Sequence, residues 1–223
     1  GEVKTFPGAA GGIIFYPKVP LIEQKELLNT LIEKFTHGKR ILQGNYIHMS
    51  DILQDSYMLS KVGRLIASHY IHNNIDVVMT VESKGIGLAT IVARYLNVPY
   101  VIARRDSTDG IGPTISVNYV SGSYQTIKKM ELEKNSLKTN QRVLIVDDFL
   151  RNGGTAQGMI SLLEEFDSTA VGVCVLGENR SHETNQLTLP IDSLISVQLV
   201  YNDEERRYEL DVQPGSLFNQ LTE

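Results

Sequence analysis

Short runs of consecutive apolar residues recur through the middle of the chain. They occupy residues 77–81, 100–103, 143–146 and 170–176. Runs of this length are typical of strands that are covered on both faces. Segments with helical spacing of apolar residues separate them, at residues 87–96 and 155–166. This alternation predicts an α/β fold with a mainly parallel sheet flanked by helices.

Further elements are expected on either side of this repeat. Helical spacing predicts helices at residues 21–35 and 56–72, and the sequence Asn97-Val98-Pro99 should end the helix before it. Two strands joined through residues 121–123 are expected at residues 116–120 and 129–132, after a turn-rich stretch at 106–113. A late pair of strands is expected at residues 194–201 and 208–212.

The first 18 residues differ in texture from the rest of the chain. Glycines and prolines surround one short apolar run at residues 13–16, which predicts a turn leading into a lone strand. A single strand is too small to bury a core. We therefore expect residues 1–18 to form no core of their own and residues 19–223 to contain the main domain.

Composition and charge exclude several classes of protein. Apolar residues make up 42% and charged residues 21% of the 223 residues, which is ordinary for a globular domain. No apolar run approaches the ~20 residues that cross a bilayer, and a single cysteine, Cys174, suits a reducing cytoplasm. The net charge of −5 gives no electrostatic footprint for nucleic acid, and isolated basic doublets such as Arg104-Arg105 are expected on solvated surface.

One segment, residues 143–155, carries the most specific chemistry. An apolar strand ends in the adjacent carboxylates Asp147 and Asp148, and a loop then leads to Gly153-Gly154-Thr155 at a helix start. Backbone N–H groups at such a helix start suit a phosphate, which the carboxylates would repel. The acids should therefore face sugar hydroxyls, so that the segment suits a ribose 5-phosphate. The alternative is a polar turn that the glycines merely permit.

A second glycine-containing loop follows the strand at residues 77–81. Ser83, Lys84 and Gly85 could hold a second anion, such as a diphosphate. A dinucleotide fingerprint is the alternative, but Thr90 stands where its third glycine belongs. No Gly-Lys-Ser/Thr sequence follows either loop, which excludes a P-loop. The five histidines are scattered and predict no metal site.

These two loops resemble those of type I phosphoribosyltransferases. In that family the segment at residues 143–155 binds phosphoribosyl diphosphate (PRPP), and the stretch at 80–89 is the diphosphate loop. The resemblance covers residue 21 to the end and implies a role for each matching residue. The ribose ligands are Asp147 and Asp148; the 5-phosphate ligands are Arg151, Asn152, Gly153, Gly154 and Thr155; the diphosphate ligands are Ser83, Lys84 and Gly85; and Tyr119 and Lys128 lie in a flexible loop that closes over PRPP.

Other stretches are similar to the purine operon repressors of Gram-positive bacteria. They are residues 7–12, 59–63, 76–81 and 117–123. The resemblance implies a cytoplasmic homodimer without transferase activity, in which an N-terminal winged helix binds operator DNA and PRPP weakens that binding. Residues 1–18 would be the end of the winged helix. The resemblance implies no required cofactor and no bound metal, although Mg²⁺ could accompany the diphosphate of PRPP.

Two other functions remain open at this point. The first is an active purine phosphoribosyltransferase of the xanthine type, whose loop sequence is similar. Some purine enzymes of this family carry a general-base carboxylate in the phosphate loop, where Asn152 cannot accept a proton. The second is the binding of another phosphate-rich nucleotide, such as a guanosine alarmone, in the same loops.

Overall fold

The computed structural model describes residues 2–8, 11–105, 112–121, 126–180, 187 and 189–222. Its centre is a six-stranded sheet in the order β12-β11-β10-β9-β5-β6. All neighbouring strands are parallel except β12, which pairs with β11 antiparallel at one edge. The strands are β5 (Val77–Val81), β6 (Tyr100–Ala103), β9 (Arg142–Leu150), β10 (Thr169–Asn179), β11 (Ile191–Asn202) and β12 (Arg207–Pro214). The predicted mainly parallel sheet is confirmed.

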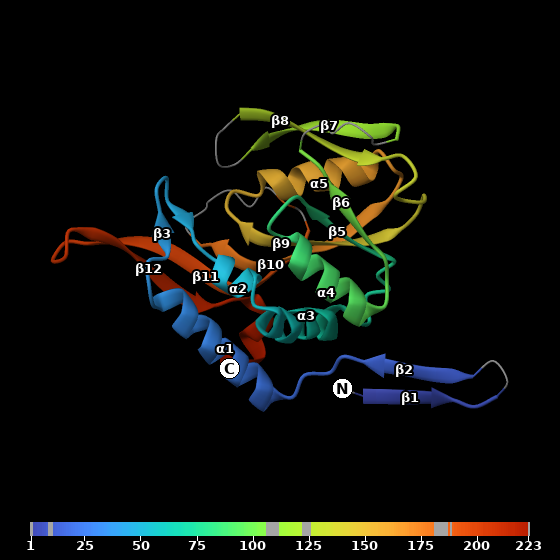
Figure 1. Ribbon diagram of the computed structural model, residues 1–223, viewed down its shortest axis with the longest axis horizontal. Coiled ribbons are helices and arrows are strands. Elements are labelled where there is room, and N and C mark those ends of the chain that lie inside the picture. Colours follow the sequence, from blue (N-terminus) through green and yellow to red (C-terminus); the bar gives the residue numbers. More distant parts are fainter. Residues whose placement is uncertain are drawn as a thin grey trace.

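Helices cover both faces of the sheet (Figure 1). On one face, the helices α1 (Leu21–Thr36), α2 (Ser50–Leu53), α3 (Ser56–Tyr70) and α4 (Ile86–Leu96) share one apolar core with the strands. On the other face, α5 (Gly154–Glu164) is covered in turn by a hairpin of β7 (Thr114–Ser121) and β8 (Thr126–Glu133). The chain ends in the short helices η1 (Ser216–Phe218) and α6 (Asn219–Thr222).

Local sequence signals explain where the helices begin and end. The Asp55 side chain accepts hydrogen bonds from the backbone N–H groups of Tyr57 and Met58 and so caps the N-terminus of α3. The helix α4 ends at Asn97, which adopts a left-handed conformation with a φ of 58°. The predicted stop before Pro99 is confirmed. None of the helices in the described ranges is long and apolar enough to cross a membrane.

The start of the chain differs from the expected lone strand. Two strands, β1 (Glu2–Phe6) and β2 (Gly12–Tyr16), pair antiparallel in a hairpin that projects from the domain (Figure 1). The lone-strand prediction was therefore wrong, because Glu2–Phe6 lacks the strict alternation of polar and apolar residues that indicates a strand. Both strands of the hairpin are exposed, and among their residues only Tyr16 at the end of β2 is partly buried.

Two expected connections lie largely outside the described residues. The turn-rich stretch at residues 106–113 is described only at its end, and the link at residues 121–123 only at Ser121. The strands on either side are longer than expected, since all eight residues of β7 pair with the eight of β8.

Candidate functional site

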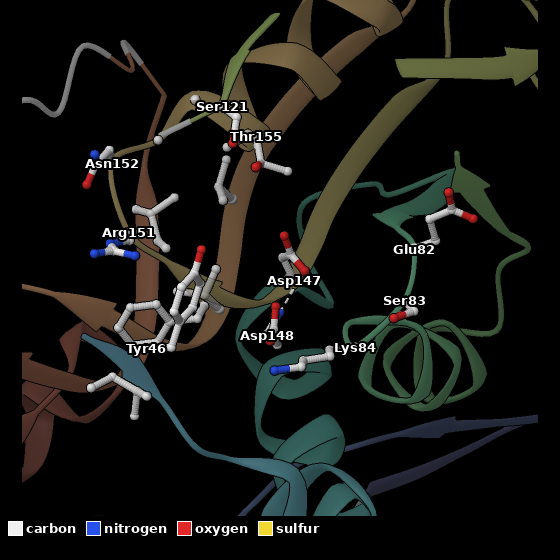
Figure 2. A pocket seen from close by; sticks show the side chains of 18 of the residues that line it. Tyr46, Glu82, Ser83, Lys84, Ser121, Asp147, Asp148, Arg151, Asn152 and Thr155 are labelled. Carbon is white, nitrogen blue, oxygen red and sulfur yellow. Dashed lines mark hydrogen bonds between the residues drawn. The ribbon is translucent and has the colours of Figure 1, made fainter. Parts of the chain in front are cut away.

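A cavity of about 310 Å³ opens beyond the carboxyl ends of β5 and β9, where open parallel sheets bind ligands. Both loops singled out in the sequence contribute to its wall (Figure 2). The predicted ligand residues that line it are Ser83, Lys84, Lys128, Asp147, Asp148, Arg151, Asn152, Gly153, Gly154 and Thr155.

The acid pair lies on the floor of this cavity. Asp147 is only 8% exposed, and its Oδ1 accepts a hydrogen bond of 2.8 Å from the backbone N–H of Asp148. Burial raises the pKa of Asp147 well above its ordinary value, and the charge of Asp148 raises it further. The strand does not end at these acids as predicted: β9 continues to Leu150, because its last residues pair with the long strand β10.

The phosphate loop leads directly into α5. Gly153 adopts a left-handed conformation with a φ of 76°, which favours glycine, and it stands at the N-cap of α5. Because glycine has no side chain, the first backbone N–H groups of α5 receive no cap from this residue. Gly153, Gly154 and Thr155 line the cavity, so this helix N-terminus suits an anionic group.

The second loop lies on the opposite side of the acid pair. Figure 2 shows Ser83 and Lys84 just before α4, on the side of the acid pair that faces away from Arg151 and Asn152. Gly85 does not line the cavity. It lies behind the wall instead, where a Cβ atom would stand 2.5 Å from Thr80 Oγ1 and 2.7 Å from Asp147 Oδ1. The absence of a side chain at Gly85 thus lets the loop pack against the acid.

A cationic residue that the sequence prediction placed on solvated surface also lines the cavity. Arg105 follows β6, and its backbone N–H donates a hydrogen bond of 2.7 Å to Glu82 Oε1. Its Nε is buried and has no hydrogen-bond partner in the part of the chain that the structure describes. The charge of Arg105 moderates the raised pKa of Asp147. The sequence signal that could have identified Arg105 as a cavity residue is its position just after a strand of a parallel sheet, where ligands bind.

Arg151 turns away from the acid pair and toward a small hairpin of β3 (Ile41–Leu42) and β4 (Tyr46–Ile47). Its guanidinium lies 5.0 Å from the centre of the Tyr46 ring, and Nη2 donates a hydrogen bond of 3.2 Å to the Gly44 carbonyl (Figure 2). Tyr46 and Ile47 line the cavity and were not predicted, because strands of two residues leave no hydrophobic period.

The small hairpin is held in place by a buried arginine. Arg40 is 9% exposed, and its guanidinium forms a double hydrogen bond to the Asp51 carboxylate, at 2.5 and 2.9 Å. It also donates to the carbonyls of Lys34 and His48. The end of α1, the hairpin and α2 are thereby joined at one point, which fixes this wall of the cavity.

The β7–β8 hairpin gives a mixed outcome. Lys128, which was predicted in a loop that closes over the ligand, lines the cavity, and so does Ser121. Tyr119 does not: it is 7% exposed and packs on α5, where a Cβ atom at Gly158 would lie 2.8 Å from its ring. The expectation that Tyr119 faces the ligand is therefore corrected, since Gly158 leaves a recess that the aromatic ring fills.

The cavity offers carboxylates in one place and cations in another. Among the described residues, no group of three or more His, Cys, Asp or Glu side chains lies close enough together to hold a metal ion. Asp147 and Asp148 supply oxygen ligands of the kind that Mg²⁺ prefers, but further oxygens would have to come from a ligand.

Comparison with known proteins agrees with this geometry. A family model described as phosphoribosyl transferase domain matches residues 48–205. The fold is similar to that of adenine phosphoribosyltransferase from Thermoanaerobacter pseudethanolicus, with a TM-score of 0.65 and 23% identity over 76% of this chain and 99% of that chain. Fold and family model together define a phosphoribosyltransferase-type domain.

Relatives that match nearly the whole chain define its family more narrowly. The chain is 45% identical over 221 residues to the probable purine biosynthesis transcriptional regulator PurR of Streptococcus pneumoniae, covering 99% of this chain and 79% of that protein. It is 43% identical to the Bacillus subtilis repressor PurR over 97% of this chain and 74% of that protein. It is 42% identical to the Lactococcus lactis activator PurR over 98% of this chain and 79% of that protein. The chain belongs to this PurR family of purine biosynthesis transcriptional regulators.

Proposed function

We propose that this chain is the effector-binding part of a transcriptional regulator of purine genes, and that PRPP is the effector. The observation that carries the proposal is the arrangement of the cavity. The acid pair Asp147 and Asp148 lies between an uncapped helix N-terminus at Gly153 and the cations Lys84 and Arg105. PRPP carries two ribose hydroxyls between a 5-phosphate and a diphosphate, in the same order.

Each part of the ligand has a physical reason to bind where it does. The ribose hydroxyls donate hydrogen bonds to the carboxylates of Asp147 and Asp148. The first turn of α5 binds the 5-phosphate through backbone N–H groups. Lys84 and Arg105 neutralise the diphosphate. A Mg²⁺ ion, where present, would share the diphosphate oxygens with the acid pair.

The regulator is proposed to act by repression, with PRPP weakening the binding of operator DNA. The relatives are named repressor in Bacillus subtilis and activator in Lactococcus lactis, so the direction of the effect must be measured. The β1–β2 hairpin supports a DNA-binding unit next to the effector domain. Its exposed apolar side chains, which range from Phe15 at 46% to Ile13 at 72%, suit packing inside a further domain. The homodimer stays a prediction, which sedimentation of the intact protein measures.

We further propose that the domain binds PRPP without transferring its phosphoribosyl group. The relatives that are 42–45% identical to this chain are named as regulators, whereas those named xanthine phosphoribosyltransferase are 29–30% identical. Asn152, which lines the cavity in the phosphate loop, carries an amide that cannot serve as a general base. Incubating the protein with PRPP, Mg²⁺ and each purine base, and following nucleotide formation, tests this point. Steady formation of a nucleotide from any base would make the protein an enzyme.

Binding itself is tested by calorimetry with PRPP and Mg²⁺. Asp147→Ala and Asp148→Ala should each keep the fold, judged by thermal unfolding, and weaken PRPP binding by at least about tenfold, equivalent to ~1.4 kcal/mol. Asp203→Ala, which removes an exposed acid in the β11–β12 turn, is the matched control and should bind normally. Unchanged affinity in both cavity variants would contradict the proposal.

A further inference from the structure

The β1–β2 hairpin joins the effector domain through residues 17–20, and this connection is firmly held. Pro17 and Val19 are buried, and Val19 belongs to the core that α1 and α3 share. Gln24 Nε2 donates a hydrogen bond of 2.9 Å to the Val19 carbonyl. A segment with buried side chains and bonded carbonyls has little conformational freedom, so the hairpin must leave the domain in a defined direction.

One side chain of α3 binds Lys18, an exposed residue of this connection. Arg64 Nη2 donates a hydrogen bond of 2.6 Å to the Lys18 carbonyl, and Nη1 donates one of 2.9 Å to Glu23 Oε2 at the start of α1. The Arg64 side chain is only 24% exposed. Its planar guanidinium thus bridges α3, the connecting segment and α1, which a lysine in its place could not do with the same geometry.

The helix that carries Arg64 is packed tightly on the helix that starts at the cavity. Gly63 lies so close to α4 that a Cβ atom there would stand 2.5 Å from Ile91 Cγ2. The hydroxyl groups of Ser60 and Tyr95 add a hydrogen bond of 2.9 Å between the same two helices. The helix α4 begins directly after the loop that contains Lys84, so the loop, α4 and α3 are joined in one packed unit.

We propose that Arg64 is a positioning residue that sets the direction of the β1–β2 hairpin and passes movements of α3 and α4 on to it. The part of the proposal that concerns ligand response rests on the proposed function. Ligand binding at the Lys84 loop would displace α4, α3 would follow, and Arg64 would turn the connecting segment. The unit that contains the hairpin would then change its orientation without any contact to the ligand.

The positioning role can be measured without any ligand or DNA. Spin labels at Lys4→Cys in the hairpin and Glu165→Cys at the end of α5 report the distance between the two parts in the intact protein. Cys174 is fully buried, so we expect the label to react only with the two introduced cysteines. We expect a narrow distance distribution with Arg64 present and a broader or shifted one in Arg64→Ala. An unchanged distribution would overturn the positioning role.

The coupling role is measured with the intact regulator, PRPP and a DNA duplex from its purine promoter. Arg64→Ala should leave PRPP affinity unchanged but bring the ratio of DNA affinities without and with PRPP closer to one, by about two- to thirtyfold. Lys61→Ala is the matched control, because it lies one turn earlier on α3 and contacts the Tyr57 ring. The full wild-type ratio in Arg64→Ala would refute the coupling role.

Two further variants keep the test valid if Arg64→Ala unfolds. Glu23→Gln removes the charge of one partner and keeps the bond to Lys18, and it should lose only part of the coupling. Arg64→Lys keeps the charge but not the planar guanidinium with its paired N–H donors, and it should also retain only part of the coupling between PRPP and DNA binding. If wild-type protein shows no PRPP effect on DNA binding, the proposed function fails, whereas the label distances still decide whether Arg64 positions the hairpin.

Discussion

Gly85 offers a sharp test of how the two loops of the cavity depend on each other. In Gly85→Ala the new Cβ atom would lie 2.5 Å from Thr80 Oγ1 and 2.7 Å from Asp147 Oδ1. Unstrained contacts are about 3.5 Å, so these atoms must separate by roughly 1 Å. The backbone at Gly85 has a φ of −70°, which alanine adopts without strain, so the effect is purely steric.

Overpacking of this kind costs about 1–3 kcal/mol of the free energy of unfolding. The atoms that must move include a carboxylate oxygen of Asp147, so ligand binding should suffer as well. We expect Gly85→Ala to weaken PRPP binding by at least about tenfold, which is ~1.4 kcal/mol. Calorimetry gives the affinity, and urea unfolding gives the stability of the same preparation.

Gly87→Ala is the matched control, two residues further along the same chain segment. Its nearest neighbour would be Leu59 Cδ1 at 3.2 Å, the end of a flexible side chain. Alanine also favours the helix α4 over glycine by up to ~1 kcal/mol, so this variant should be about as stable as the wild type and bind normally. Wild-type affinity in Gly85→Ala would refute the argument that the loop must pack against the acid.

The double variant Gly85→Ala/Thr80→Ala separates the two overlaps. The Thr80 hydroxyl is buried and has no hydrogen-bond partner within the described residues, so removing it sacrifices no hydrogen bond there. Stability should therefore recover in part, with a coupling energy of about 0.5–3 kcal/mol. Ligand affinity should recover less, because the overlap with Asp147 remains.

Three further outcomes are expected. Gly158→Ala should lower the stability by about 1–3 kcal/mol, measured by urea unfolding, because the aromatic ring packed there has to move. Burial opposes ionisation of Asp192, but hydrogen bonds from His69 and Tyr70 hold its pKa below the ordinary value. Its contribution to stability is therefore present above pH ~4 and is lost as the pH falls through the folded-state pKa. In Asp192→Asn, the loss of stability with falling pH should be less steep in this range. Burial raises the pKa of Asp147, so binding of a ligand that favours the carboxylate should release protons. Calorimetry in buffers of different ionisation enthalpy detects this release, and a binding enthalpy that does not depend on the buffer would contradict the prediction.

The sheet and its helices were predictable because their signals are local. The apolar runs at Val77–Val81 and Tyr100–Ala103 match β5 and β6 residue for residue. The order of strand, acid pair and glycine-rich helix start likewise placed Asp147 and Gly153 at the carboxyl edge of the sheet. These predictions needed only the periodicity of the chain and the geometry of parallel strands.

Three of the errors, at Leu150, Tyr119 and Arg105, have one cause, which is contact between segments that are distant in the sequence. Leu150 stays in β9 because it pairs with Glu178, and the local sequence after the acid pair gives no sign of that partner. Tyr119 turns away from the cavity because Gly158 leaves room for its ring on another element. Arg105 enters the cavity because β6 ends beside β5, whereas an isolated basic doublet predicts only solvated surface.

The distribution of carboxylates in the cavity bears on whether the domain turns its ligand over. The carboxylates that line it within the described residues are Glu82, Asp147 and Asp148. Glu82 accepts the backbone N–H of Arg105 and so secures the strand end that supplies this cation. The acid pair is needed for the ribose hydroxyls in the proposed complex. That leaves the amide of Asn152 in the phosphate loop, at the position where the family resemblance implies a proton-accepting carboxylate in some purine enzymes. In the proposed complex each of these three carboxylates therefore already has a role, either in binding the ribose or in holding the cavity wall, and the assay of nucleotide formation decides whether the domain also transfers the phosphoribosyl group.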